Sequence, residues 1–240
     1  MTEPMAILAR GAIELGVELS PRQLEQFETY YRELADWNQR VNLTAIVEYE
    51  EVQVRHFLDS LTVLKALPDG PPTSLRIVDV GAGAGFPGLP LKLAFPEIHL
   101  VLVESVGKKA RFLEHLVDVL GLSGVEVLAK RAEELAHRAE LRESSDLAVS
   151  RGVARLATLL EYCLPFCRLG GRTVLLKRGI EQELVGASHA LEALGGHPAG
   201  VFPVRVTGLT DGRVVLVVDK VNATPDQYPR RPGMPAKRPL

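Results

Sequence analysis

RIVDVGAGAGFPG, residues 76–88, indicates the fold class, because a short apolar run leads directly into a glycine-rich loop. Four further apolar runs of strand length follow it: LVLVE at 100–104, VEVLA at 125–129, DLAVS at 146–150 and TVLLK at 173–177. Helices are expected between these runs, for example at 108–120 and 156–167. Apolar strands that alternate with helices indicate an α/β protein with a parallel, doubly wound sheet.

Two last apolar runs complete the predicted sheet. VFPVRV (201–206) and RVVLVV (213–218) are separated by the short loop GLTDG, which contains an Asp-Gly pair. Strands joined in this way are typical of a hairpin, so the last strand is expected to run antiparallel.

The residues before the glycine-rich stretch predict a helical extension. Ser20 and Gln23 have the spacing of a capping box, with Pro21 at the first helical position between them. A further helix is expected at 48–66, and the turn-rich segment PDGPPTS at 68–74 is the expected linker. The chain is therefore divided into a helical extension (1–70), an α/β domain (71–221) and a proline-rich, basic, irregular arm (222–240).

Composition and charge narrow the class of protein. Apolar residues make up 46% and charged residues 24% of the 240 residues, as in an ordinary globular protein. Two cysteines are too few for a disulfide-stapled secreted domain, and neither a signal peptide nor a membrane-spanning run is expected, so a cytoplasmic protein is predicted. The sequence leaves the oligomeric state open, and a monomer is the expectation. Because the net charge is −2, any RNA contact must come from local basic patches.

The glycine-rich loop predicts a nucleoside cofactor beyond the end of its strand. Gly81, Gly83 and Gly85 permit a tight turn and let a ligand approach the backbone. The dinucleotide pattern G-x-G-x-x-G fails from Gly81 and succeeds only from Gly83, too far past the strand, which leaves a nicotinamide-dependent oxidoreductase as the alternative. Asp79 favours S-adenosylmethionine, because a carboxylate attracts its ammonium group and repels a pyrophosphate. The other interpretation of Asp79 is that it caps the turn.

Further cofactor contacts are predicted at the ends of the next two strands. Glu104 ends the second strand, where an acid bonds the ribose hydroxyls of a nucleoside. Ser105 and Val106 follow it and are placed to contact the adenine. Ala132 and Glu133, after the third strand, either flank the adenine edge or simply place an acid at a helix N-terminus.

The residues indicate no nucleophile and no base for a methyl transfer, which is a direct displacement that depends mainly on alignment. Cys163 and Cys167 lie four apart on a predicted helix, which indicates an inert packed pair. The loop SRGVAR at 150–155 lacks the acid-proline-proline-aromatic pattern that aligns exocyclic amines. Guanine N7 has a free lone pair and no proton to lose, so this site fits it, with no catalytic side chain and no metal expected. Arg151 either faces the cleft, to bind phosphate or the cofactor carboxylate, or pairs with a surface acid.

Longer segments resemble one family. They are WNQRVNLTAI (37–46), RHFLDSL (55–61), DVGAGAGFPGLPL (79–91), GKKARFLE (107–114), RAEEL (131–135), SRGVA (150–154) and YPRRPGMPAKRPL (228–240). Through them the chain resembles the RsmG (GidB) family of bacterial 16S rRNA guanine-N7 methyltransferases over nearly its whole length. The resemblance implies the class I, Rossmann-like methyltransferase fold, a mostly parallel seven-stranded sheet with an antiparallel last strand and an N-terminal helical extension.

The resemblance also implies a substrate, a cofactor and its contacts. The substrate would be 16S ribosomal RNA, free or in the small ribosomal subunit, with 7-methylguanosine as the product and S-adenosylmethionine as the methyl donor. Cofactor contacts would fall on Gly81, Phe86, Glu104, Ser105, Val106, Ala132, Glu133 and Arg151.

Other polar residues are candidates for the RNA side of the site. His56, Asp59 and Ser60 share one helical face, which the resemblance places by the cleft, where His56, Asp59 and Arg151 would position the guanine; a buried polar cluster is the alternative. The candidate phosphate contacts, for which a solvated charge cluster is the alternative, are Lys108, Lys109, Arg230, Arg231, Lys237 and Arg238. A non-catalytic RNA-binding module that senses a nucleoside is the remaining alternative function.

Overall fold

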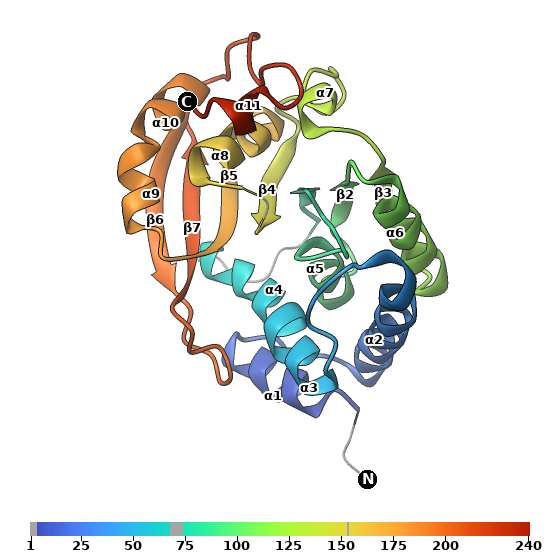
Figure 1. Ribbon diagram of the computed structural model, residues 1–240. Helices are drawn as coiled ribbons and strands as arrows, with labels where there is room; N and C mark the ends of the chain where they lie inside the picture. The colour runs from blue at the N-terminus through green and yellow to red at the C-terminus, as the bar shows by residue number, and fades with distance from the viewer. Residues whose placement is uncertain (1–3, 68–73, 153) are drawn as a thin grey trace.

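The structure, a computed structural model, describes residues 4–67, 74–152 and 154–240. Its centre is a seven-stranded sheet in the order β3-β2-β1-β4-β5-β7-β6 (Figure 1). The strands are β1 (Arg76–Val80), β2 (His99–Val103), β3 (Val125–Leu128), β4 (Ser145–Arg151), β5 (Cys167–Arg178), β6 (Gly196–Pro203) and β7 (Arg213–Lys220). Neighbours run parallel except at β5–β7 and β7–β6, which confirms the predicted sheet with its antiparallel last strand.

Helices cover both faces of the sheet because alternate side chains of each buried strand point to opposite faces. Leu100 and Leu102 of β2 join the core on one face, and Val101 and Val103 join the core on the other. The first core includes residues of α5 (Gly88–Ala94) and α6 (Gly107–Val119). The second includes residues of α7 (Ala132–Leu135), α8 (Leu156–Cys163) and α10 (Ser188–Leu194), with α9 (Glu181–Gly186) beside it.

The N-terminal helices complete the first core and do not form a core of their own. They are α1 (Ala6–Glu14), α2 (Pro21–Val41), α3 (Tyr49–Val52), a π-helical segment (Gln53–Leu58), α4 (Asp59–Leu61) and a 3-10 segment (Thr62–Ala66). The predicted capping box of α2 is present, and its Gln23 amide also donates to the carbonyls of Leu93 (2.8 Å) and Ala94 (2.9 Å). The extension thereby provides hydrogen-bond donors for carbonyl groups in the last turn of α5, the helix that follows the glycine-rich loop.

One expected helix end differs from the structure, and one expected boundary lies outside the described residues. The helix expected at 156–167 ends at Cys163, because Pro165 cannot donate a helical hydrogen bond, and a 3-10 turn then leads into β5 at Cys167. The linker expected at 68–74 lies outside the described residues except for its last residue. The three-part division of the chain remains a prediction.

The C-terminal arm is packed against the domain, as Figure 1 shows for the red segment beside α8. It contains one short helix, α11 (Met234–Lys237), and the Thr158 hydroxyl of α8 donates to the Pro235 carbonyl at 3.0 Å. Within the described part of the chain, no helix combines the length and the apolar character that crossing a bilayer requires.

Candidate functional site

A cavity of about 390 Å³ opens where β1, β2 and β4 end, at the switch point of the sheet. Of the residues predicted to bind the cofactor, it is lined by Gly81, Gly83, Phe86, Glu104, Ser105, Ala132, Glu133 and Arg151. Asp79, Gly85 and Val106 lie outside the lining, and their contact with a ligand remains a prediction. The Val106 side chain is 40% exposed, and its backbone N–H is held by Glu104 instead.

The glycine-rich loop is shaped by positive backbone φ angles at Gly81 (76°), Gly83 (60°) and Gly85 (98°). Gly85 has a second requirement, since a Cβ there would lie 2.5 Å from the Tyr30 hydroxyl. That hydroxyl, from α2, donates to the Ala84 carbonyl at 2.5 Å. Gly85 therefore allows the helical extension to hold the loop, and it does not line the cavity.

Asp79, near the end of β1, anchors the glycine-rich loop through the residue at its far end, Gly88. Its side chain is fully buried, and Oδ2 accepts a 2.7 Å hydrogen bond from the Gly88 N–H at the start of α5. Oδ1 has no hydrogen-bond partner among the described residues. Burial raises the pKa of Asp79 from 3.8 to about 7, against the opposing effect of the Gly88 hydrogen bond. This geometry matches the alternative in which Asp79 caps the turn, and the predicted attraction of an ammonium group remains a prediction.

Asp79→Asn tests this burial through the pH dependence of stability. The folded protein keeps a proton on Asp79 up to about pH 7, whereas the unfolded chain releases it near the ordinary value of 3.8. The folded state therefore binds more protons in that window, so stability is greatest below it and is lost as the pH rises through about 7. In urea denaturation, the free energy of unfolding of the wild type should fall relative to that of the variant from about pH 4 to about pH 7. If the free energies of unfolding of the wild type and the variant differed by the same amount across that range, the pKa of Asp79 would not be raised by burial.

Glu104 is a carboxylate that lines the cavity from the sheet side. It follows β2 and is 6% exposed; Oε1 accepts from the Val106 N–H at 2.7 Å, and Oε2 accepts from the Gly83 N–H at 2.9 Å. A carboxylate has about four acceptor positions, so two remain for donors in the cavity. Glu104 thus fixes the loop and presents a negatively charged acceptor to a vicinal diol.

The opposite wall joins the cavity to the C-terminal arm. Glu133 is 3% exposed and accepts a 2.9 Å hydrogen bond from the Gly233 N–H of the arm. Tyr162 of α8 lines the same wall, and burial, reinforced by the charge of Glu133, raises its pKa to about 12. Sequence patterns did not indicate Tyr162 as a cavity residue, because its helix has the apolar composition of an ordinary core helix.

The helical extension also supplies lining residues that the sequence did not reveal, Leu43 and Thr44. Asn38 fixes this loop by accepting from the Thr44 N–H (2.9 Å) and donating to the Thr44 carbonyl (3.0 Å). Both residues belong to WNQRVNLTAI, so the segment that is specific to the family forms part of the cavity. An aromatic contact supports the same wall, with the Phe86 ring stacked on Tyr30 (5.5 Å) and on His56 (4.5 Å).

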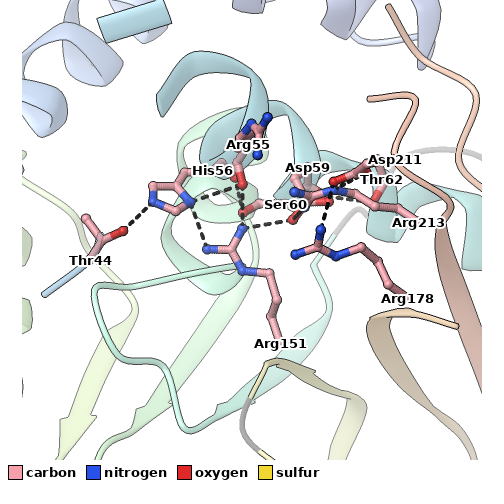
Figure 2. A network of polar contacts seen from close by, with 10 residues as sticks. All are labelled: Thr44, Arg55, His56, Asp59, Ser60, Thr62, Arg151, Arg178, Asp211 and Arg213. Atoms are coloured by element: carbon pink, nitrogen blue, oxygen red, sulfur yellow. Dashed lines mark hydrogen bonds and ion pairs between the residues drawn. The ribbon is translucent and has the colours of Figure 1, made fainter. Parts of the chain in front are cut away.

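A polar network lies beside Phe86, and Figure 2 shows how its side chains converge. Arg151 lies over the Phe86 ring, 4.8 Å from its centroid, and pairs with Asp59 at 2.9 Å. Asp59 is 2% exposed and also pairs with Arg213 of β7 at 2.6 Å. One buried carboxylate of the helical extension therefore holds two arginines that come from β4 and β7.

His56 is neutral in this network. Burial, and then the charge of Arg151, lower its pKa to about 3. Its Nε2 is 2.8 Å from the Thr44 hydroxyl, and its Nδ1 is 3.2 Å from the Arg151 guanidinium. Ser60 is fully buried, and its hydroxyl donates to the His56 carbonyl at 2.6 Å. This contact fits the alternative interpretation, in which the three residues form a buried polar cluster. His56 and Asp59 fit both interpretations. Their contacts with Arg151 connect the helical extension to the sheet, and both side chains also line a cavity, His56 the first and the second, and Asp59 the second.

A second cavity, of about 450 Å³, adjoins the first and shares its wall residues His56, Arg151 and Gly152. Its other lining residues are Ile46, Arg55, Asp59, Ala154, Leu176, Lys177, Arg178, Arg213 and Val214. Within residues 4–67, 74–152 and 154–240, no cluster of three or more His, Cys, Asp or Glu side chains is arranged to hold a metal ion.

The predicted RNA contacts separate into two groups. Lys109 lines the first cavity, and Lys108, Arg231, Lys237 and Arg238 are exposed. Arg230 instead pairs with Glu161 of α8, which is fully buried, through Nε–Oε1 (2.9 Å) and Nη2–Oε2 (2.6 Å). This bidentate pair gives Arg230 a structural role, because its guanidinium neutralises a buried carboxylate, and its contact with RNA remains a prediction.

Arg230→Ala should therefore affect stability. It leaves the Glu161 charge buried without its partner, and the free energy of unfolding should fall by about 3 kcal/mol in chemical denaturation. Arg231→Ala, at the exposed neighbouring position, is the matched control and should change it by less than about 0.5 kcal/mol. Equal effects of the two substitutions would rule out this role of the ion pair.

The strand order, the glycine-rich loop after β1 and the acid after β2 together define a Rossmann-like methyltransferase fold. The structure is similar to that of TrmN from Thermus thermophilus (TM-score 0.52, 19% identity, 69% of this chain and 49% of that chain). It is also similar to MtNAS in complex with S-adenosylmethionine (TM-score 0.56, 16% identity, 91% of this chain and 78% of that chain). At these identities the likeness shows the fold.

Sequence comparison identifies the family within that fold. The family model for rRNA small subunit methyltransferase G (GidB) matches residues 23–204. The chain is 50% identical to ribosomal RNA small subunit methyltransferase G of Dehalococcoides mccartyi strain CBDB1 over 97% of its length and 98% of that protein. It is 47% identical to the protein of the same name from Moorella thermoacetica, over 98% of this chain and 97% of that protein. The chain therefore belongs to the rRNA small subunit methyltransferase G family.

Proposed function

We propose that this protein transfers a methyl group from S-adenosylmethionine to N7 of a guanine in 16S ribosomal RNA. The observation that supports this function most directly is the first cavity. There the Glu104 carboxylate lies between the glycine-rich loop and the wall formed by Ser105, Ala132 and Tyr162. The bound cofactor supplies a methyl group on a positively charged sulfonium. Its ribose hydroxyls would donate to Glu104, and Ser105, Ala132 and Tyr162 would surround the adenine.

The unpartnered Asp79 Oδ1 is a further point of fit. This buried carboxyl oxygen lies beneath the loop that would receive the amino-acid end of the cofactor. An ammonium group close to the loop would favour the ionised carboxylate electrostatically, even without direct contact. A pyrophosphate in the same place would instead raise the pKa of Asp79 further.

The chain's own residues contribute alignment and not proton transfer. His56 is neutral, and both of its ring nitrogens already have partners. Burial raises the pKa of the Cys163 thiol strongly and that of Cys167 to about 12, so neither is a thiolate nucleophile. An acceptor with its own lone pair and no proton to lose, such as guanine N7, meets these conditions.

Basic residues around the cavities support an RNA substrate despite the net charge of −2. Lys109, Lys130, Arg131 and Arg151 line the first cavity, and Arg55, Lys177, Arg178 and Arg213 join Arg151 in the second. Positive charge is thus concentrated where the methyl acceptor must approach. We place the protein in the cytoplasm as a monomer that acts on free 16S rRNA or on the small subunit.

Combined Lys130→Ala and Arg131→Ala substitutions should weaken RNA binding and flatten its dependence on salt. Each lost phosphate contact should lower the log–log slope by about 0.7 for single-stranded RNA. Filter-binding measurements of a 16S rRNA fragment across salt concentrations give the slope. Arg32→Ala, on α2 with a 73% exposed side chain, is the control and should leave it unchanged. An unchanged slope in the double variant would exclude these two residues from the RNA interface.

The proposal is tested by incubating the protein with methyl-labelled S-adenosylmethionine and 16S rRNA from cells without this modification, both free and in small subunits. Nuclease digestion and chromatography should recover the label as 7-methylguanosine. Label in another nucleoside would refute the N7 assignment. Cofactor binding without any transfer would favour the RNA-binding module, and tighter binding of NAD than of S-adenosylhomocysteine would favour the oxidoreductase.

A further inference from the structure

The second cavity has the position that an acceptor site requires. Direct methyl transfer needs the donor and the acceptor on either side of one shared boundary. The two cavities meet at His56, Arg151 and Gly152, which line both. The donor cavity is bounded by the ends of β1 and β2, and the second cavity is bounded by residues of β5 and β7, on the other side of β4.

The chemistry of its walls selects the kind of ligand. Five cationic side chains line the second cavity, Arg55, Arg151, Lys177, Arg178 and Arg213, against one carboxylate, Asp59. Asp59 pairs with Arg151 and Arg213, and acids outside the lining pair with the others: Glu51 with Arg55, Glu183 with Lys177, and Asp211 with Arg178 and Arg213. A guanidinium group carries five N–H donors, so each arginine keeps donors beyond those used in its ion pairs. The excess of hydrogen-bond donors therefore suits a ligand rich in acceptors, such as a phosphate or the O6 edge of guanine, which arginine commonly recognises.

Apolar residues on the remaining walls suit the face of a base. Ile46, Leu176 and Val214 come from the helical extension, β5 and β7, and all three line this cavity. Bases of single-stranded RNA bind proteins by leaving the stack and lying against apolar surfaces or arginine planes. A volume of about 450 Å³ is within the range of small-ligand pockets.

We infer that the second cavity receives the target nucleotide, a single purine turned out of its RNA loop, with Arg178 and Arg213 facing its acceptor oxygens. The inference rests on the proposed function and deepens it. In this arrangement Asp59 is a positioning residue, because it holds Arg151 at the shared wall and Arg213 in the acceptor site. Arg178 is 62% exposed and pairs with Asp211 at 3.1 Å, so it lies at the entrance, where a phosphate would meet it first.

Two substitutions that leave the donor cavity intact test the inference. Ala154→Trp fills the second cavity, and Arg178→Ala removes a cation from its entrance; neither residue lines the first cavity. We expect both variants to bind S-adenosylhomocysteine within about twofold of the wild type by calorimetry, which also shows that they are folded. Ala154→Trp should lower kcat for methylation of 16S rRNA by at least about 30-fold, equivalent to about 2 kcal/mol, and Arg178→Ala should mainly raise KM.

The controls are Ala223→Trp and Arg168→Ala. Ala223 is exposed, and Arg168 lies at the far end of β5, 49% exposed and paired with Asp146; neither lines either cavity. Both controls should methylate at the wild-type rate. Unchanged kcat in Ala154→Trp, or loss of S-adenosylhomocysteine affinity in step with activity, would overturn the inference. If Arg178→Ala raised KM while Ala154→Trp kept a normal kcat, the cavity would bind only the RNA backbone phosphate. That result would overturn the inference that the cavity receives a base.

A second readout separates this inference from the proposed function. Guanosine 5′-monophosphate is titrated into the protein saturated with S-adenosylhomocysteine, and binding is followed by ligand-observed NMR. We expect saturable binding to the wild type that Ala154→Trp weakens at least about tenfold, equivalent to about 1.4 kcal/mol. If the wild type methylates no RNA but shows this difference, the proposed function fails and the nucleotide site stands. Equal binding to both proteins would remove the site, whatever the outcome with RNA.

Discussion

Asp59→Ala should be among the most damaging single substitutions in this protein, lowering the free energy of unfolding by about 3–5 kcal/mol. Asp59 is 2% exposed and pairs with Arg151 at 2.9 Å and Arg213 at 2.6 Å. Without it, two guanidinium groups with side chains 17% and 11% exposed are left close together with no shared counter-charge. Chemical denaturation measures the loss, and methylation should be lost beyond what unfolding explains, because Arg151 lines both cavities.

A surface ion pair provides the matched control. Asp36 pairs with Arg40 at 2.6 Å on α2, but the two side chains are 63% and 64% exposed. Asp36→Ala should therefore change stability by less than about 1 kcal/mol and leave methylation unaffected. Asp59→Asn keeps the size of the side chain and an acceptor, so it should fold better than Asp59→Ala while remaining defective in methylation. If Asp59→Asn methylated RNA at the wild-type rate, the charge of Asp59 would have no part in positioning the arginines.

The second large effect is expected from Glu104→Ala, in cofactor affinity. Hydrogen bonds to a charged group contribute about 1.5–3 kcal/mol each, so losing the ribose contacts should weaken binding by about 2–4 kcal/mol. The dissociation constant for S-adenosylhomocysteine should thus rise about 30- to 1000-fold in calorimetry. The Gly83 and Val106 N–H groups also lose their acceptor, which loosens the loop and adds to the effect.

RNA binding distinguishes this effect from general unfolding. Glu104→Ala should retain affinity for a 16S rRNA fragment within about threefold, because the basic residues that line the two cavities are unchanged. Glu114→Ala, at an exposed position on α6, is the control and should leave the affinity for S-adenosylhomocysteine unaltered. A change of less than about threefold in Glu104→Ala would show that this carboxylate does not bind the ribose.

The sequence and the structure agree best where the reason is local. RIVDV is β1 residue for residue, because an apolar run that ends in glycine has few other conformations open to it. Ser20 and Gln23 form the predicted capping box, since its two hydrogen bonds lie within one turn. Glu104 lies at the cavity because the ends of neighbouring parallel strands meet at one edge of the sheet.

The features that the sequence did not predict concern the direction or the partner of a side chain. Asp79 has the predicted place in the chain, but its carboxylate is directed to the Gly88 N–H beneath the loop. Arg230 has the predicted charge, but it is bound to Glu161, which lies 69 positions away in the chain. Tyr30 and Thr44 belong to segments with clear patterns, yet no pattern indicated that Tyr30 holds the loop or that Thr44 lines the cavity.

The amino-acid sequence was enough to predict most of the helices and strands, the order in which they alternate and the family to which the chain belongs, because secondary structure follows from neighbouring residues. The network of Asp59, Arg151 and Arg213, and the wall that two cavities share at His56 and Arg151, became visible in the folded chain alone. The physical reason is that charge pairing and burial depend on distances in space. Here those distances join α4, β4 and β7, segments that are far apart in the chain.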